Sequence, residues 1–293
     1  MLGIFSAVTL THFSSMPQTR TIVQFNRLLS AKSHLRSITR DLALRAMALN
    51  RHIESSTNWV RFPFYHHVFE DERRGFTKQL NFLSRYGDFI DLEDAIGMLV
   101  SGQPIDGRYF CITFDDGLSS CSWGAAPILV EKGIPAAFYI VANMVGKALE
   151  PGDPTARDIF GFKGKNTTLD FMTWADIRDL ANSGFTIGSH TLNHLRLLDL
   201  QENDARTEMA ESKATIEHYL QAECRHFCPP YGIPNTDFDP TRDATLAKKL
   251  GYVSLVTGQR GANQRNADPF GIRRDHLLAN WGLHQVRYFF SLI

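Results

Sequence analysis

Carboxylates and imidazoles gather at two places in this chain, each directly after a short apolar segment, and they are the side chains best suited to chemistry. Asp115 and Asp116 follow the first segment, and His190 and His194 follow the second. Because reacting groups gather where parallel strands end, we expect the two sets to lie together. The four-residue spacing of the histidines predicts that both rings share one face of a helical turn.

One carboxylate and two imidazoles form a three-ligand set for a divalent cation and leave a position open for water. Such an ion acidifies water and polarises a carbonyl. Zinc suits these ligands, and cobalt, nickel or manganese would satisfy the same set. Each motif alone also has a simpler interpretation. An Asp-Asp-Gly sequence often only makes a turn, and histidines at this spacing occur by chance in a chain that has eleven.

A third candidate is the segment Phe-Cys-Pro-Pro-Tyr-Gly that ends at Gly232. Two prolines stiffen it and the glycine permits a tight turn. A rigid turn can aim a backbone N–H at a developing oxyanion, although an ordinary Pro-Gly loop is the alternative.

Strands and helices are predicted to alternate in the part of the chain that carries these residues. Four glycines, Gly87, Gly133, Gly184 and Gly251, are predicted to end helices in the left-handed conformation. The predicted strands are 62–65, 109–114, 136–141, 185–189 and 252–256, and the predicted helices are 76–86, 92–100, 120–132, 174–183 and 201–222. This alternation predicts an α/β fold with a parallel sheet, open or closed into a barrel. Residues 146–168 are predicted to form a long loop over one end of the sheet.

The first 59 residues differ from the rest and are predicted to be a basic helical extension, with residues 60–293 forming the main domain. Between Arg20 and His52 there is a single acidic residue, Asp41, among seven Lys and Arg residues. Leucines recur there at near-helical spacing, which predicts one or two amphipathic helices. Such helices either pack on the main domain or lie on an anionic membrane, so residues 20–52 are a candidate peripheral membrane contact.

Composition narrows the class of protein. Lys and Arg number 31, as do Asp and Glu, so no overall positive charge favours a nucleic-acid partner. Four cysteines are too few for a disulfide scaffold and are predicted to be buried thiols. The first ten residues make a poor signal peptide, so we expect a cytoplasmic protein, associated with the inner membrane through its basic helices, with a periplasmic or exported protein as the alternative.

The three motifs, in this order, resemble those of the polysaccharide deacetylases, the nodulation-type deacetylase domain of carbohydrate esterase family 4. The resemblance rests on Thr-Phe-Asp-Asp-Gly ending at Gly117, Ser-His-x-x-x-His ending at His194, and Pro-Pro-Tyr-Gly ending at Gly232. The stretch Tyr65-His66-His67-Val68 also resembles bacterial members. Coverage runs from about residue 62 to the C-terminus. The resemblance implies an irregular, incomplete (β/α) barrel.

The resemblance also implies a role for each site residue. Asp115 is the expected general base, and Asp116, His190 and His194 are the expected metal ligands. The backbone N–H of Tyr231 is expected to hold the oxyanion of an N-acetyl group under attack by water. The expected acid is His276, in the sequence Ile-Arg-Arg-Asp-His-Leu, with His284 as a weaker candidate.

One position departs from the family pattern. Many members carry an arginine just before Pro-Pro-Tyr, where it orients the catalytic aspartate, and this chain has Cys228 there. Arg273 or Arg274 is expected to replace it from another strand, since a guanidinium is the natural partner of an ionised carboxylate. Tyr65, His67, Pro230 and Trp281 are predicted to contact substrate, and Tyr231 and Trp174 are further candidate faces for sugar rings.

The expected function is metal-dependent removal of N-acetyl groups from amino sugars of a polysaccharide or glycan precursor. Two alternatives stay open. A barrel of the same type could hydrolyse a small cyclic amide or imide, with the 146–168 loop shaping a closed pocket. A catalytically silent glycan-binding barrel would account for the arginine missing at Cys228.

Overall fold

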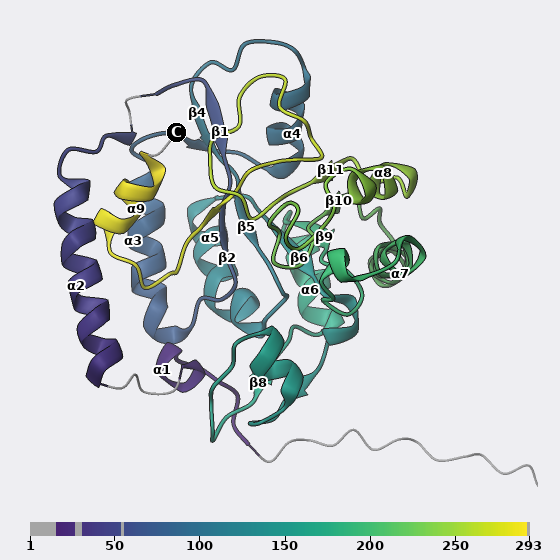
Figure 1. Cartoon of the computed structure of the whole chain (residues 1–293), viewed down its shortest axis with the longest axis horizontal. Helices are drawn as coiled ribbons and strands as arrows, with labels where there is room; N and C mark the ends of the chain where they lie inside the picture. The colour runs from purple at the N-terminus through teal and green to yellow at the C-terminus, as the bar shows by residue number, and fades with distance from the viewer. Residues whose placement is uncertain (1–15, 27–30, 54–55, 292–293) are drawn as a thin grey trace, which may run out of the picture.

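A computed structural model describes residues 16–26, 31–53 and 56–291 of the chain (Figure 1). Its centre is a seven-stranded parallel sheet with the order β11-β10-β9-β6-β5-β2-β12. The strands are β2 (Pro63–Tyr65), β5 (Ile112–Phe114), β6 (Ala136–Ile140), β9 (Thr186–Ser189), β10 (His226–Phe227), β11 (Ser254–Leu255) and β12 (Asp275–His276). The two edges approach each other at a parallel bridge between Val256 and Ile272. The sheet therefore curls into an irregular (β/α) barrel, as predicted.

A second sheet of three strands has the order β1 (Trp59–Arg61), β4 (Arg108–Phe110) and β3 (Asp88–Phe89). The single strand predicted over 109–114 is wrong in this respect, because it divides at Cys111. β4 pairs with β1 and β3, whereas β5 pairs with β2 and β6. The Cys111 N–H donates to the Arg61 carbonyl across the break, so the strand bends from one sheet into the other.

Helices cover the outside of the barrel close to the predicted positions. They are α3 (Arg73–Leu83), α4 (Leu92–Val100), α5 (Ala126–Lys132), α6 (Trp174–Asn182) and α7 (Glu202–Leu220), with a π-helical turn at Cys121–Ala125 before α5. α8 (Arg242–Lys249) is the helix predicted to end at Gly251, although its bounds were not predicted, and α9 (Leu283–Phe290) was not predicted. Gly133, Gly184 and Gly251 have the expected positive φ. Gly87 does not, and its small size instead permits close approach to the Arg108 backbone.

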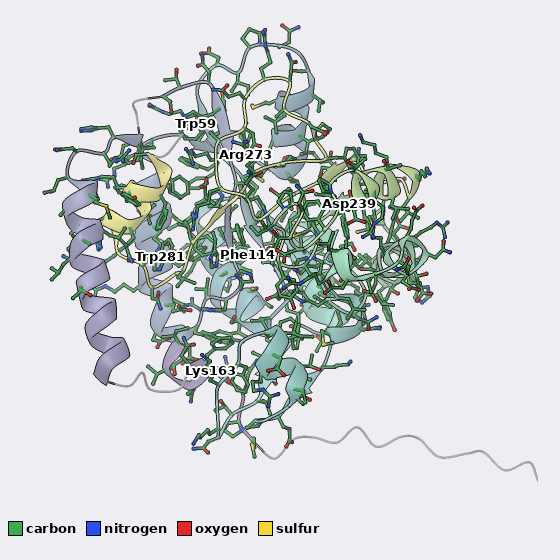
Figure 2. The ribbon with its side chains drawn as sticks, in the orientation of Figure 1. Trp59, Phe114, Lys163, Asp239, Arg273 and Trp281 are labelled. Carbon is green, nitrogen blue, oxygen red and sulfur yellow. The ribbon has the colours of Figure 1, made fainter. Side chains whose placement is uncertain are left out.

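Aromatic rings form much of the core between the sheet and these helices, and Phe114, labelled in Figure 2, is one of them. Phe114 and Phe138, on neighbouring strands, stack with their ring centroids 4.8 Å apart. Every residue of β5 and of β6 is buried. The near-continuous apolar strands of the sequence are thus explained, because both faces of a covered parallel sheet are removed from water.

The N-terminal residues form α1 (Ile22–Phe25) and α2 (Ala31–Ala48), and α2 lies beside α9 in Figure 1. Leu44 and Ala48 are buried, and Asp41 of α2 accepts a 2.7 Å hydrogen bond or ion pair from His284 of α9. Leu42, Met47 and Leu49 are exposed. The boundary near residue 59 and the membrane contact of residues 20–52 stay predictions. Among the described residues no helix is both long and apolar enough to cross a membrane.

The long loop predicted over 146–168 lies at the carboxyl end of the barrel and is more ordered than expected. β7 (Ala148–Leu149) and β8 (Leu169–Asp170) pair antiparallel at its base. A π-helical turn, Thr155–Ile159, lies at its far end. Three further short 3-10 turns are Glu70–Glu72, Ala142–Met144 and Leu197–Asp199.

Candidate active site

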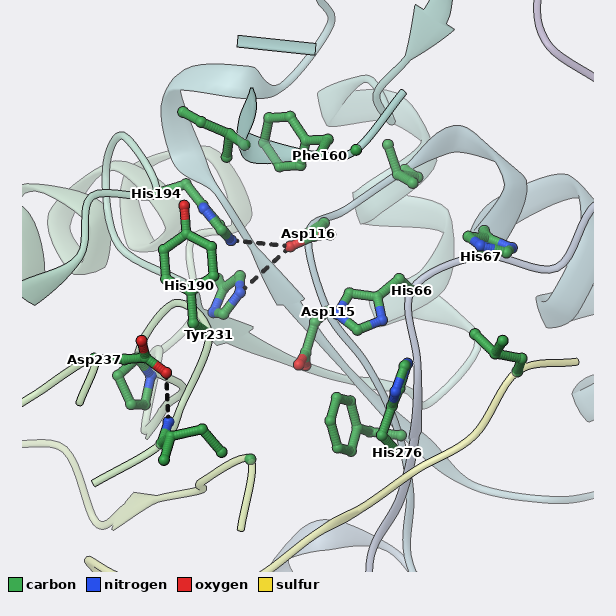
Figure 3. A pocket seen from close by; sticks show the side chains of 18 of the residues that line it. His66, His67, Asp115, Asp116, Phe160, His190, His194, Tyr231, Asp237 and His276 are labelled. Atoms are coloured by element: carbon green, nitrogen blue, oxygen red, sulfur yellow. Dashed lines mark hydrogen bonds and ion pairs between the residues drawn. The ribbon is translucent and has the colours of Figure 1, made fainter. Parts of the chain in front are cut away.

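A pocket of about 560 Å³ lies where the strands of the barrel end, and it gathers most of the predicted site residues (Figure 3). Asp115 and Asp116 follow β5, His190 and His194 follow β9, and Tyr231 follows β10. The remaining lining residues include Phe25, Phe64, His66, His67, Leu118, Ile159, Phe160, Ile233, Asp237 and His276.

Asp115 forms a buried bidentate ion pair with Arg274. Arg274 Nη1 and Nη2 donate to the two carboxylate oxygens, each at 2.7 Å. Asp115 is 3% exposed and Arg274 is 1% exposed. Burial raises the pKa of Asp115, but the Arg274 charge and hydrogen bonds outweigh it and bring the pKa below its ordinary value. The carboxylate is therefore ionised at neutral pH and fixed in orientation.

The surroundings of Arg274 include Cys228, the residue that stands at the position of the expected family arginine. Arg274 Nη2 lies 3.0 Å from Cys228 Sγ, the atom at the head of the Pro-Pro-Tyr segment. Its Nε donates to the Thr257 carbonyl at 2.9 Å, and its guanidinium lies 4.2 Å from the centroid of the Phe64 ring. Of the two predicted arginines, Arg273 is not at Asp115. Arg273, labelled in Figure 2, borders a separate cavity together with Asn263.

Asp116, His190 and His194 lie together as predicted. Asp116 Oδ1 is 3.4 Å from His190 Nε2 and 3.2 Å from His194 Nε2, and all three residues are buried. Burial raises the pKa of Asp116, but its interaction with the neighbouring imidazoles of His190 and His194 brings it well below its ordinary value.

This group fits a tetrahedral metal ion. Metal–ligand distances of about 2.0–2.1 Å give tetrahedron edges of about 3.3–3.4 Å, close to the observed separations. Asp116 Oδ1 is buried without a hydrogen-bond donor among the described residues, as expected of a ligand atom. His190 Nδ1 lies 2.7 Å from the Cys228 carbonyl, which orients the ring and leaves Nε2 for the ion. A second cluster, Asp115 with His190 and Cys228, is less suitable because Arg274 already holds both Asp115 oxygens.

The two histidines meet through an irregular loop, so the helical turn predicted for them is wrong. Thr191 and His194 have φ of 66° and 61°, and the Thr191 hydroxyl accepts from the His194 N–H at 3.0 Å. The buried carboxylate of Glu208 on α7 holds this loop. It accepts from the backbone N–H of Leu192 and of Asn193 at 3.1 and 2.8 Å. Nothing in the local sequence connects Glu208 with the loop that it fixes.

Left-handed backbone recurs at the site. Asp116 and Tyr231, which are not glycines, have φ of 69° and 62°. Such conformations cost energy and are kept where the surroundings enforce them. After Tyr231, Gly232 has φ 79° and its N–H donates to the Pro230 carbonyl at 2.7 Å. The Tyr231 N–H has no hydrogen-bond acceptor among the described residues, so it is free for a ligand oxygen.

His276 and His66 lie side by side on the other flank of Asp115 (Figure 3). Their ring centroids are 4.9 Å apart, and His276 Nε2 is buried without a partner in the described part of the chain. Burial, together with the neighbouring His66 and Arg260, lowers the pKa of His276 to about 3. Burial also lowers the pKa of His66. Both rings are therefore neutral at pH 7.

Of the residues predicted to contact substrate or sugar rings, His67 and Tyr231 line the pocket. His67 Nδ1 lies 2.8 Å from the buried carboxylate of Glu72. Tyr65 is wholly buried and its hydroxyl donates to Gln79, because alternation along β2 turns Phe64 and His66 to the pocket and Tyr65 away. Pro230, Trp281 and Trp174 do not line this pocket either, so their contacts with substrate stay predictions. His284 contacts α2 instead.

Sequence reasoning missed two aromatic walls of the pocket. Phe160, from the 146–168 loop, has its ring 5.1 Å from that of His194. Phe25, from α1, has its ring 5.2 Å from that of His67. Both belong to segments without a recognisable motif. The four cysteines are free and buried, as predicted.

Comparisons with known proteins agree with this geometry. The sequence pattern of the polysaccharide deacetylase family matches residues 102–255. The "Putative polysaccharide deacetylase YxkH" of Bacillus subtilis (strain 168) is 25% identical over 224 residues, which cover 76% of this chain and 68% of that protein.

Solved structures share the fold. IcaB from Ammonifex degensii superposes with a TM-score of 0.66 at 23% identity, over 80% of this chain and 97% of that one. The Streptococcus pyogenes deacetylase PplD, in complex with acetate, gives 0.64 at 18% identity, over 80% and 99%. The family match covers more than half of the chain and includes both aspartates and both histidines of the site. The chain therefore belongs to the polysaccharide deacetylase family.

Proposed function

We propose that this protein is a metal-dependent deacetylase that hydrolyses the N-acetyl group of an amino sugar in a polysaccharide or glycan precursor. The observation that carries the proposal is the pairing of two sites: an ionised carboxylate fixed by Arg274, directly beside the Asp116–His190–His194 group. A divalent cation held by those three residues would supply a Lewis acid that polarises the acetyl carbonyl and lowers the pKa of water. Zinc suits the ligand set.

The remaining steps belong to side chains of the chain itself. Asp115 takes a proton from water while the water oxygen attacks the acetyl carbon. The oxyanion accepts a hydrogen bond from the backbone N–H of Tyr231, and a donor of this kind is worth about 3–4 kcal/mol in the transition state. The C–N bond then breaks, which releases acetate and leaves a free amine.

The amine nitrogen needs a proton as it leaves, and His276 stays the proposed donor. Its unpartnered Nε2 and its position beside Asp115 support this role. Because the ring is neutral at rest, it must receive the proton that Asp115 took from water before it passes one on. His66 is the neighbouring ring that could share the task.

Release of acetate by wild type and by Asp115→Asn tests the proposal. Wild type should deacetylate N-acetylglucosamine oligomers, and Asp115→Asn should lose turnover but still bind metal. Asp88→Asn is the matched control, because Asp88 is exposed on β3 and away from the pocket. Full activity in Asp115→Asn would overturn the assignment of the base.

The same assay separates the two alternatives. The 146–168 loop does line the pocket, so cyclic imides are tested beside the oligomers. Turnover of imides alone would favour the cyclic amidohydrolase, and binding of oligomers without turnover of either would favour the silent barrel. Cytoplasmic location at the inner membrane face stays a proposal, which cell fractionation tests.

A further inference from the structure

Residues 16–26, here called the N-terminal strap, lie against the 146–168 loop beside the pocket. The Thr19 N–H donates to the Thr168 carbonyl at 3.0 Å, and the Thr168 N–H donates to the Pro17 carbonyl at 3.0 Å. Side chains reinforce this contact, because the hydroxyls of Thr19 and Thr167 are 2.7 Å apart and buried. The Lys163 N–H donates to the Phe25 carbonyl at 2.9 Å.

The other edge of the N-terminal strap is fixed to the turn that follows β2. The Glu70 N–H donates to the Arg20 carbonyl at 2.9 Å, and the Ile22 N–H donates to the Asp71 carboxylate at 3.0 Å. The Arg20 guanidinium lies 4.5 Å from the centroid of the Trp123 ring. Hydrogen bonds therefore bind the strap on both sides, and it forms a continuous wall with its neighbours.

Phe25 is the residue that this wall presents to the pocket. It lines the pocket and is 8% exposed. Its ring packs against those of His67, Phe69 and Phe162, at centroid distances of 5.2, 5.6 and 5.7 Å. The pocket is therefore closed by packed aromatic rings on this side.

Across the pocket from His67, which Phe25 contacts, the side that carries Tyr231 is open to solvent (Figure 3). Tyr231 and Ile233 line it and are each 42% exposed. The guanidinium of Arg196 lies 4.9 Å from the centroid of the Tyr231 ring and offers a polar rim. A chain of sugars can leave the pocket here, whereas Phe25 blocks its path at the other end.

Building on the proposed function, we propose that Phe25 is a specificity-determining residue that limits the substrate to an N-acetylated amino sugar at or near the end of a glycan. The acetylated sugar sits beside Asp115, no more of the chain fits beyond it toward Phe25, and the rest extends past Tyr231 and Ile233. The residue lies outside the segment that matches the family, 102–255, so this feature belongs to the N-terminal strap of this chain.

Chain-length dependence of turnover tests this inference in the full-length protein. We would measure kcat and KM of wild type, Phe25→Ala and Val23→Ala on N-acetylglucosamine oligomers of increasing length, and map which sugar loses its acetyl group. Val23→Ala is the matched control, because Val23 is on the same short helix, is 58% exposed and does not line this pocket.

Wild type should deacetylate a terminal sugar. Phe25→Ala should extend cleavage to internal sugars and raise kcat/KM for long oligomers relative to short ones about tenfold, in the range that a pocket wall controls. Val23→Ala should behave as wild type. Equal use of internal and terminal sugars by wild type, or an unchanged profile in Phe25→Ala, would overturn the proposal. If Phe25→Ala does not fold, Phe25→Leu gives a smaller change in the same direction.

Binding separates a failure of this inference from a failure of the proposed function. Calorimetric titration of the same oligomers into Asp115→Asn, with and without Phe25→Ala, needs no turnover. Tighter binding of long oligomers after Phe25→Ala supports the closed wall. If oligomers bind and are deacetylated but Phe25→Ala changes the chain-length dependence of neither binding nor turnover, only the proposed role of Phe25 is refuted. If no oligomer is bound or deacetylated, the proposed function and this inference both fall.

Discussion

Replacement of Arg274 by methionine is the most informative perturbation of the site. It keeps an apolar stem but removes both 2.7 Å hydrogen bonds to Asp115, whose carboxylate is 3% exposed. A buried charge that loses its partner costs about 3–5 kcal/mol, a large share of the roughly 5–15 kcal/mol that stabilise a typical domain. We therefore expect a clear fall in the free energy of unfolding measured with urea.

The same change should alter the pH dependence of turnover. With Arg274 removed, only the weaker effects of His190 and His66 oppose burial, so the pKa of Asp115 should rise. Asp115 then becomes protonated at a higher pH, so the acidic limb of the pH profile of kcat/KM should shift to higher pH. We expect a loss of about a hundredfold or more at neutral pH, because both the ionisation and the orientation of the base suffer.

A double-mutant cycle keeps the experiment interpretable. Asp115→Asn removes the charge that Arg274 neutralises, so Asp115→Asn/Arg274→Met should be less destabilised than the sum of the single variants. A second comparison moves the guanidinium to the family position. Because Cys228 Sγ is 3.8 Å from Asp115 Oδ2, Cys228→Arg/Arg274→Ser should recover part of the activity lost in Arg274→Ser. Additive stabilities together with an unshifted pH profile in Arg274→Met would refute the reasoning.

Three further predictions follow from the site. In His190→Ala/His194→Ala, metal content measured by elemental analysis should fall from about one ion per chain to none. The control His284→Ala alters only a contact between α2 and α9 and should keep its metal. Metal retained in the double variant would place the ion elsewhere. In His276→Asn, kcat should fall about 10²–10⁴-fold with metal still bound; a loss of this size only in His66→Asn would move the acid role to that ring. In metal-free protein, the lowered pKa of His276, about 3 against an ordinary 6.5, means that the unfolded chain binds this proton first as the pH falls through 6.5. Between pH 7 and pH 5 the free energy of unfolding in urea should therefore fall by about 2 kcal/mol more for wild type than for His276→Asn. The same pH dependence of stability in both proteins would contradict the assigned environment of His276.

The barrel and the metal-binding group could be predicted because their signals are local. Apolar strands, each followed by polar residues, predicted that Asp115, Asp116, His190 and His194 lie at one end of a parallel sheet, and the structure has them there. Alternation along a strand could have resolved two further choices. Arg274 directly precedes β12 and is two residues from His276, so the two share a face, whereas Arg273 does not. Tyr65 of β2 points away from the face that carries Phe64 and His66.

The remaining features depend on contacts between segments far apart in the sequence. Phe25 reaches the pocket because the N-terminal strap pairs with residues near Thr168, and this pairing leaves no periodic signal. Glu208 of α7 fixes the loop that carries His194, but the sequence of α7 is that of an ordinary polar helix and does not indicate this contact. Left-handed backbone at Thr191 could not be expected, because a β-branched residue rarely adopts it.

The most direct test of the account is the time course of acetate release from N-acetylglucosamine oligomers by the full-length protein before chelation, after chelation and after re-addition of zinc or cobalt. The account predicts release that stops when the metal is removed and returns when it is restored. Release that continues undiminished in the chelated, metal-free protein, or no release from any oligomer in the metal-loaded protein, would contradict it.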